Sequence, residues 1–277
     1  MKEIIIKPNR PWWNIGWKEV WSYRDLLILF VRRDFVSVYK QTILGPIWFL
    51  IQPVLTTITF TVIFGNVAGL STDGTPSLLF YMAGITIWTY FSECFMKTAN
   101  SFTANAAVFG KVYFPRLISP LSVVISNLFK FGIQFILFLA FWLYYKYTGT
   151  SIAMHYSVML LPFYILLMAG IGLGLGLIIS SVTTKYRDMK FLLGFGIQLF
   201  MYATPIVYPI SILEGIYKKL MFFNPLAHII EAFKYSFTGK GNFDLIGLGY
   251  STGFMLVALF VGVIVFNRVE RTFMDTV

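Results

Sequence analysis

The most prominent pattern in the chain is a series of long apolar runs separated by short polar segments. Six runs are long enough to cross about 30 Å of hydrocarbon as α-helices. They cover residues 47–65, 78–96, 121–145, 158–182, 191–207 and 245–266. The fifth run is the shortest, and because Pro205 lies within it and Pro209 follows it, we expect its outer end to be irregular. The sequence therefore predicts an all-α integral membrane protein with six transmembrane helices.

Composition and charge support this class. Hydrophobic residues make up 57% of the 277 residues and charged residues 12%, against about 25% charged residues in soluble domains. The net charge of +10 raises nucleic-acid binding as an alternative. However, 16 of the 22 Lys and Arg residues lie in segments that the six spans place on the same side of the membrane as the N-terminus. An excess of Lys and Arg is typical of cytoplasmic loops. We therefore expect both termini in the cytoplasm and no nucleic-acid partner.

A shorter apolar segment precedes the first span. Residues 24–40 combine apolar positions at helical spacing with basic side chains, and the apolar part is too short to cross. We predict an amphipathic helix in the cytoplasmic interface, named the interface helix below. The alternative is that residues 26–31 pack into the bundle. The chain thus divides into a cytoplasmic N-terminal region, 1–46, and a transmembrane domain, 47–277, that ends in a cytoplasmic segment, 267–277.

The segment between the fifth and sixth spans, residues 210–237, contains two apolar halves that are each too short to cross. Asn224 and Pro225 separate the halves and suit the N-cap and the first turn of a second helix. We predict a re-entrant helical hairpin that enters the membrane from outside and acts as an outer gate, with Pro205 and Pro209 loosening the span before it. The alternative is a helical loop that lies on the surface.

Charged residues inside the apolar segments are few, and each costs about 2.5–3.5 kcal/mol unless it is paired or hydrated. Glu93 and Lys130 lie near the inner ends of the second and third spans, at similar depth. They either form an ion pair or line a water-filled path. In the outer gate, Glu231 either pairs with Lys234 or lines the exit.

Polar side chains also recur at helical spacing. Gln52, Thr56 and Thr59 share one face of the first span, and Gln198 and Tyr202 share one face of the fifth. Both stripes are consistent with helices that face a central conduit. Threonine also hydrogen-bonds to the carbonyl four residues earlier, which leaves its helix free to face any side.

The chain carries no enzyme signature. It lacks a phosphate-binding GxxxxGK[ST] loop, an HExxH pair and a GxSxG elbow. A single cysteine, Cys94, excludes an intrachain disulfide, and two histidines are too few for a histidine-rich metal site. We expect no catalytic residue, metal or cofactor on this chain. The run GIGLGLG, residues 170–176, has GxxxG spacings that serve either packing within the bundle or a subunit interface.

Four stretches in the chain form an ordered set. They are RRDFVSVYKQTILGPIWFLIQP (32–53), FGKVYFPRLISPLS (109–122), TKYRDMK (184–190) and MYATPIVYPIS with FFNPLAHIIEAFKYSF (both within 201–237). Together they resemble the membrane subunits of ATP-binding-cassette exporters for cell-surface polysaccharides, the O-antigen, capsule and teichoic-acid group. Val38 and Lys234 depart from this pattern, because many relatives carry arginine there.

The resemblance implies a homodimer in the bacterial cytoplasmic membrane, with two separate ATPase subunits docked on its inner loops. ATP and Mg²⁺ would be bound by those ATPase subunits, and a lipid-linked polysaccharide would pass between the two membrane subunits, in contact with membrane lipid. The residues it implies for coupling to the ATPase are Arg33, Asp34, Phe114, Pro115, Arg116, Tyr186, Arg187 and Asp188. Their basic members have an alternative explanation, which is the positive charge of inner loops.

A long glycan needs weak, repeated contacts, and aromatic rings stack on sugars without a fixed register. The predicted conduit residues are Gln52, Thr56, Phe60, Glu93, Lys130, Gln198, Phe200, Tyr202 and Tyr208. Packing of the core is the alternative role for the aromatic members.

Three other functions compete with polysaccharide export. An exporter subunit for another lipid or a drug would share the fold but usually lacks the pattern of residues 32–53. A membrane transferase acting on lipid-linked sugars would need acids or histidines clustered at one membrane face, and here the acids are dispersed. A receptor or scaffold would not need charges within its spans.

Overall fold

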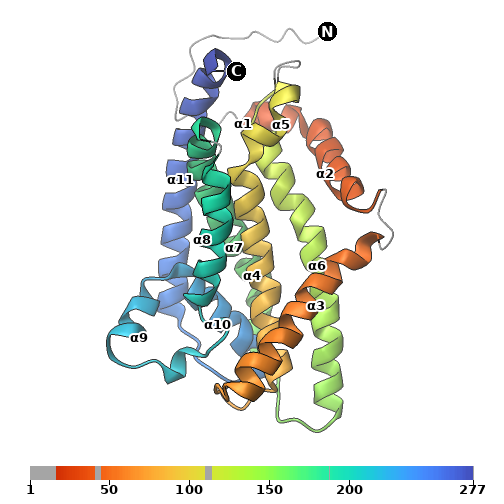
Figure 1. Ribbon diagram of the computed structural model, residues 1–277, viewed down its shortest axis with the longest axis vertical. Helices are drawn as coiled ribbons and strands as arrows, with labels where there is room; N and C mark the ends of the chain where they lie inside the picture. The colour runs from red at the N-terminus through yellow and green to blue at the C-terminus, as the bar shows by residue number, and fades with distance from the viewer. Residues whose placement is uncertain (1–16, 41–44, 110–113, 187, 277) are drawn as a thin grey trace.

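The computed structural model describes residues 17–40, 45–109, 114–186 and 188–276, in which helices are joined by turns and irregular segments and no strand occurs. Figure 1 labels the α-helices in chain order. Their bounds are α1 Trp17–Ser22, α2 Arg24–Tyr39, α3 Trp48–Phe60, α4 Ser77–Ala99, α5 Ser101–Phe109, α6 Ile118–Tyr147, α7 Leu161–Lys185, α8 Met189–Tyr202, α9 Gly215–Phe222, α10 Pro225–Thr238 and α11 Leu245–Thr276. The predicted all-α fold is confirmed.

Among the described residues, five helical segments are long and apolar enough to cross a membrane. They are Trp48–Val67, Ser77–Ala99, Ile118–Tyr147, Tyr156–Lys185 and Leu245–Val269. They correspond to the first four predicted spans and the sixth. The predicted cytoplasmic segment 267–277 does not begin with a break, because α11 continues through it to Thr276.

The fifth predicted span is shorter than expected. Helix α8 has 14 residues, about 21 Å at 1.5 Å per residue, and it ends at Tyr202. Residues 203–208 form turns, because Pro205 cannot donate the backbone hydrogen bond that would continue the helix. The irregular outer end that the sequence predicts from Pro205 and Pro209 is therefore found, and the helical part covers less of residues 191–207 than their number suggests. The count of six spans stays a prediction.

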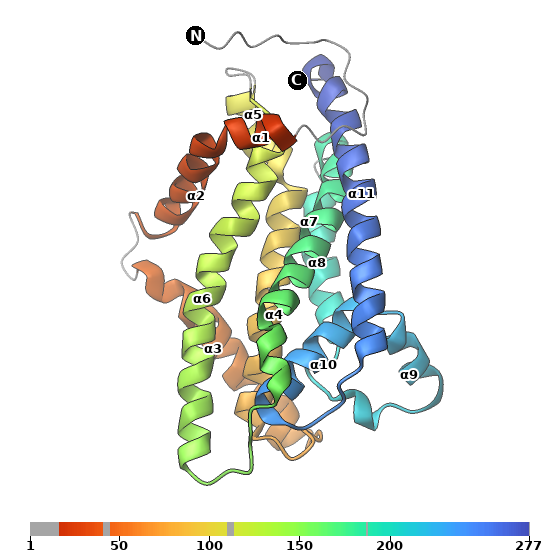
Figure 2. The ribbon, with the colours of Figure 1, turned by 180° about the vertical axis from the view of Figure 1, so that it is seen from behind.

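The helices have two distinct ends (Figures 1 and 2). Helices α1 and α5 and the last turns of α11 lie at one end, and α9 and α10 lie toward the other. Following the predicted orientation, we name these the inner and outer ends.

Helix α7 packs between α4 and α11, and its glycines make both contacts possible. A Cβ on Gly176 would lie 2.6 Å from the Cβ of Thr98 on α4, and a Cβ on Gly174 would lie 2.6 Å from the carbonyl carbon of Ala258 on α11. Only hydrogen at these positions allows such a close approach. Of the two roles predicted for the glycine run, the structure shows packing within one chain.

Helix α3 carries a proline in its interior, and a side chain of α6 compensates for it. Pro53 has no N–H to donate to the carbonyl of Phe49. The Gln134 side-chain Nε2 donates to that carbonyl at 3.0 Å instead. The proline thus creates an acceptor that joins α3 to α6.

The predicted interface helix is found as α2, which has two different faces. Phe30 is buried and packs edge-on against Phe114, with ring centroids 5.5 Å apart, while Ile28 and Leu29 are exposed. One face is therefore covered by the protein, as the alternative for residues 26–31 supposed, and the other remains apolar and open. Its position in the membrane interface stays a prediction.

We expect Gly174→Ala to lower the melting temperature of the purified chain, because the added methyl overlaps the α11 backbone and overpacking costs about 1–3 kcal/mol. The matched control is Gly253→Ala on α11, where the methyl meets open space and improves helix propensity. Thermal unfolding in detergent measures both variants. Equal melting temperatures for the two would contradict the close contact.

We expect Gln134→Leu to destabilise the chain by about 1 kcal/mol, because it leaves the Phe49 carbonyl without a donor. In a Pro53→Ala background the backbone N–H returns, so the same substitution should lose less. A double-mutant cycle on melting temperature or denaturant midpoint gives the coupling between the two positions. The same loss in both backgrounds would show that Gln134 does not serve the proline.

Candidate functional site

A cavity of about 670 Å³ lies between α3, α4, α6 and α8. All but two of the predicted conduit residues line it, namely Gln52, Thr56, Phe60, Glu93, Lys130, Gln198 and Tyr202. Phe200 instead packs on Trp88, with ring centroids 5.9 Å apart. The hydroxyl of Tyr208 donates to the carbonyl of Tyr202 at 3.1 Å. The two polar stripes read from the first and fifth spans therefore face one space.

The cavity also has lining residues that the sequence reading missed. Asn127 and Gln134 lie on α6 with Lys130, at spacings of three and four residues, so they form a third polar stripe that the sequence contains. Trp48 and Trp88 add aromatic surface from α3 and α4. The tryptophans carry no comparable signal, because aromatic residues occur throughout the chain.

The charged residues at the inner end of the cavity form a triad rather than a pair. The Glu93 carboxylate lies 3.3 Å from the Lys130 ammonium, as predicted, and 2.6 Å from the Lys97 ammonium one helical turn away. Asn127 accepts a hydrogen bond from Lys97 at 3.2 Å. The predicted ion pair between Glu93 and Lys130 is therefore present, and both residues also line the cavity; their place on a water-filled path stays a prediction.

One side of the cavity is left uncovered by the residues that the structure describes. Gln52 and Thr59 on α3, and Gln198 and Tyr202 on α8, are exposed although they line the cavity. Thr56 hydrogen-bonds to the Gln52 carbonyl at 2.9 Å and still faces the same space. Polar side chains on helices of this apolarity are poorly matched to lipid.

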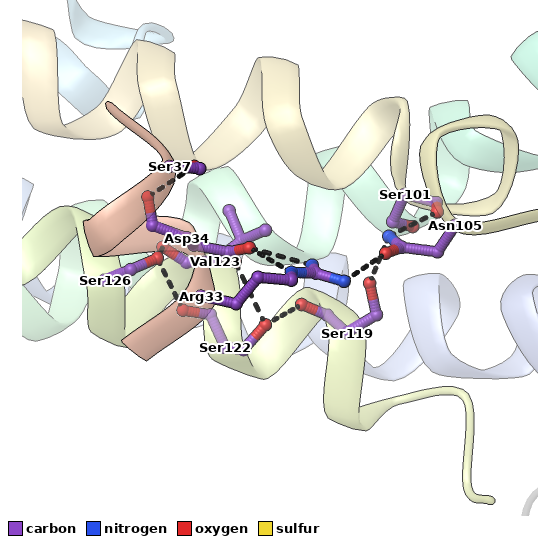
Figure 3. Close-up of polar contacts among 9 residues, drawn as sticks. All are labelled: Arg33, Asp34, Ser37, Ser101, Asn105, Ser119, Ser122, Val123 and Ser126. Carbon is purple, nitrogen blue, oxygen red and sulfur yellow. Dashed lines mark hydrogen bonds and ion pairs between the residues drawn. The ribbon is translucent and has the colours of Figure 1, made fainter. Parts of the chain in front are cut away.

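The inner end is tied together by a hydrogen-bond network centred on Arg33 (Figure 3). Its Nε and Nη2 donate to Asp34 Oδ1 at 2.9 and 2.8 Å, and its Nη1 donates to Asn105 Oδ1 at 3.1 Å. Asn105 in turn donates to the Ser119 hydroxyl at 2.9 Å. Arg33 therefore joins α2 to α5 directly and to α6 through Asn105.

The predicted coupling residues separate into buried and exposed groups. Phe114 is buried, and Arg116 is 9% exposed with its guanidinium 5.7 Å from the ring centroid of Phe109. Tyr186 is 51% exposed and Asp188 is exposed. Pro115 is half-buried, and Arg187 lies outside the described residues. Tyr186 and Asp188 therefore offer surface to a partner, as does Arg33, whose side chain is 44% exposed.

The two halves of the predicted outer gate differ in burial. Helix α10 is buried except at Tyr235, whereas α9 has no buried residue and exposes Ile216 and Tyr217 by 67% each. The predicted cap is present, because Asn224 Oδ1 accepts from the Leu226 N–H at 3.0 Å. Protein therefore encloses the second half alone, and the membrane depth of α9 stays a prediction.

Lys234 holds the end of α8 against α10. Its ammonium donates to the carbonyl of Pro205 at 2.6 Å and lies 3.5 Å from the ring centroid of Phe80. The nearest carboxylate oxygen of Glu231 is 4.0 Å away. The lysine thus contacts backbone carbonyls that the broken helix leaves without helical partners, and Pro209 is buried in the same turn region.

Comparisons with known proteins agree with this architecture. The family model of the ABC-2 type transporter matches residues 25–238. The chain is 27% identical to the O-antigen export system permease protein RfbA of Klebsiella pneumoniae over 252 residues, 91% of this chain and 94% of the relative. The protein of the same description from Myxococcus xanthus is 26% identical, over 78% of this chain and 82% of the relative.

A third relative is the polysialic acid transport protein KpsM of Escherichia coli, 21% identical over 84% of this chain and 89% of the relative. The matched region of the family model runs from the start of α2 to the end of α10, so it contains the cavity and both of its polar walls. This chain is a multi-pass membrane protein that belongs to the ABC-2 type transporter family.

Proposed function

We propose that this chain is the membrane subunit of an ATP-driven exporter that moves a lipid-linked polysaccharide across the bacterial cytoplasmic membrane. The observation that carries the proposal is the cavity, whose polar and aromatic side chains stand on helices that are otherwise apolar. The relatives that export O-antigen or transport polysialic acid support this class of cargo.

The lining suits a sugar chain that must keep moving. Phe60 and Tyr202 present rings with centroids 6.3 Å apart, and such rings stack on sugars without a fixed register. Gln52 and Gln198 add amide groups that exchange hydrogen bonds with hydroxyls. The contacts are individually weak, which permits translocation.

A second copy of this chain is the proposed cover for the open side. The exposed stripes on α3 and α8 would then face each other across a shared conduit instead of facing lipid. Helix α8 also exposes Phe191 and Phe195, an apolar surface available for the same contact. A homodimer therefore resolves the mismatch between polar side chains and lipid.

Two ATPase subunits, which would bind ATP and Mg²⁺, are proposed to dock at the inner end. Tyr186 and Asp188 supply the exposed contact surface there, while Phe114 and Arg116 transmit movement through the cluster of buried rings beneath α2. At the outer end, α10 and its Lys234 anchor stay fixed and α9 is the moving part of the gate.

We expect Gln52→Cys, Thr56→Cys and Gln198→Cys, each in a Cys94→Ala background, to react with a membrane-impermeant thiol reagent during export. Ile136→Cys, which is exposed on α6 away from the cavity, is the lipid-facing control. Labelling is measured in cells that produce the polysaccharide and the ATPase subunit. If the reagent labelled none of the four positions, the proposal that α3 and α8 line a conduit would be contradicted.

The dimer makes a separate prediction. Thr59→Cys in the same background should cross-link two copies through the open side and produce a band at twice the mass of the chain. Ile136→Cys should remain at the monomer mass. A cross-link at Ile136 and none at Thr59 would place the subunit contact elsewhere.

We expect Tyr186→Ala to reduce copurification of the ATPase subunit by about tenfold, because truncating a well-placed aromatic contact costs on the order of 1–2 kcal/mol. The matched control is Tyr147→Ala, which truncates a tyrosine that is 87% exposed at the outer end of α6. Arg116→Ala should instead lower the melting temperature. Undiminished copurification and export with Tyr186→Ala would exclude this surface from coupling.

A further inference from the structure

A second cleft, of about 470 Å³, lies at the inner end between α2, α4, α5 and α6. Figure 3 shows part of its wall, including Arg33, Asp34, Ser101 and Asn105. Lys130 lines both this cleft and the conduit cavity. The cleft therefore adjoins the inner end of the conduit.

The charges around this junction do not balance among the described residues that line the two spaces. Arg33, Lys97 and Lys130 are three cations, and Asp34 and Glu93 are two carboxylates. Arg33 is satisfied by Asp34 through two hydrogen bonds. The ammonium groups of the two lysines share the single carboxylate of Glu93, so one positive charge is left over.

Burial makes this surplus consequential. The side chain of Lys130 is 15% exposed, and an unpaired charge on a membrane helix is costly. Asn127 accepts a hydrogen bond from Lys97, and the Phe49 ring centroid lies 5.0 Å from the Lys130 ammonium, but neither partner carries a negative charge. An anion bound between the two ammonium groups would neutralise the surplus.

The cleft wall offers a hydroxyl donor as well. The Ser101 hydroxyl is buried and has no hydrogen-bond partner among the described residues. A tetrahedral oxyanion accepts several charge-assisted hydrogen bonds at once, and lysine is a common point-charge partner for phosphate. The polar part of the cleft therefore fits a phosphate group better than it fits a neutral ligand.

Apolar side chains surround the polar part of the cleft that contains Lys97, Lys130 and Ser101. Phe35, Met96 and Val123 also line the cleft, and the outward face of α2 exposes Ile28 and Leu29. A ligand with a charged head and a hydrocarbon tail fits this combination. A soluble anion would leave the apolar part uncovered.

We propose that the cleft binds the phosphate or diphosphate group of a lipid between Lys97 and Lys130, at the inner end of the conduit cavity. Its assignment to the lipid carrier of the cargo rests on the proposed function, whereas the phosphate site itself does not. The head group would meet the lysines before the attached chain reaches the rings of the conduit.

The test is binding of tritiated farnesyl diphosphate to the full chain in nanodiscs of neutral phosphatidylcholine. Lys97→Gln and Lys130→Gln should each weaken binding about tenfold, the effect of losing one charge-assisted hydrogen bond. Lys146→Gln, which removes the same charge from the outer end of α6, should leave binding unchanged. Equal affinity in all three variants would overturn the proposal.

Glu93→Gln distinguishes a binding role from a structural one. It removes the carboxylate that competes for both lysines, so it should tighten farnesyl diphosphate binding several-fold even though it breaks two ion pairs. Weaker binding in this variant, with an unchanged elution profile in size-exclusion chromatography, would assign the triad to structure alone and overturn the proposal.

Competition identifies the source of the phosphate. Binding that resists an excess of phosphatidylglycerol supports a carrier-type lipid, and displacement by phosphatidylglycerol supports the same site filled by bulk anionic lipid. Displacement by inorganic diphosphate at equal concentration would overturn the lipid part of the proposal. Because no ATPase or export is needed, lysine-dependent binding can persist even if the proposed function fails.

Discussion

The requirement that polar groups on membrane helices find partners inside the protein governs this structure. Water is absent from the hydrocarbon region, so an unmet donor, acceptor or charge there is expensive. Gln134 meets the carbonyl that Pro53 leaves open, and Lys234 meets the Pro205 carbonyl where α8 breaks. In both cases a defect in one helix becomes the contact that positions a second helix. The irregular backbone at Pro53 and Pro205 therefore supplies contacts that hold neighbouring helices together.

The places where this requirement is not met within one chain are equally informative. The polar stripes of α3 and α8 are exposed beside a cavity, and the lysines next to Glu93 outnumber its single carboxylate. The proposed second subunit would cover the stripes, and the proposed anionic ligand would neutralise the surplus charge. Both needs arise around one continuous region, from the inner cleft to the conduit, as expected of a path that carries a charged lipid and a polar chain.

Tight packing elsewhere makes this open region possible. Helix α7 contacts α4 and α11 through glycines that remove the distance side chains would impose, and α10 is enclosed at the outer end. These elements form the more closely packed part of the described structure. Helices α3, α8 and α9 are more exposed, and they carry the stripes and the candidate gate. The proposed contacts with a second subunit lie on α3 and α8, within this more exposed part of the chain.

The sequence by itself determined the all-α class, the positions of five helices long enough to cross a membrane, the cap at Asn224 and seven of the residues that line the cavity. These follow from run length, helical periodicity and local capping, which depend on residues near one another in the chain. Only the tertiary structure decided that Lys97 joins Glu93 and Lys130, and that Phe114 and Arg116 are buried. It also decided that α10 is buried while α9 is not, although both are short and contain apolar residues. Those outcomes depend on which helix lies opposite each side chain, and hydropathy along one chain carries no record of that neighbour.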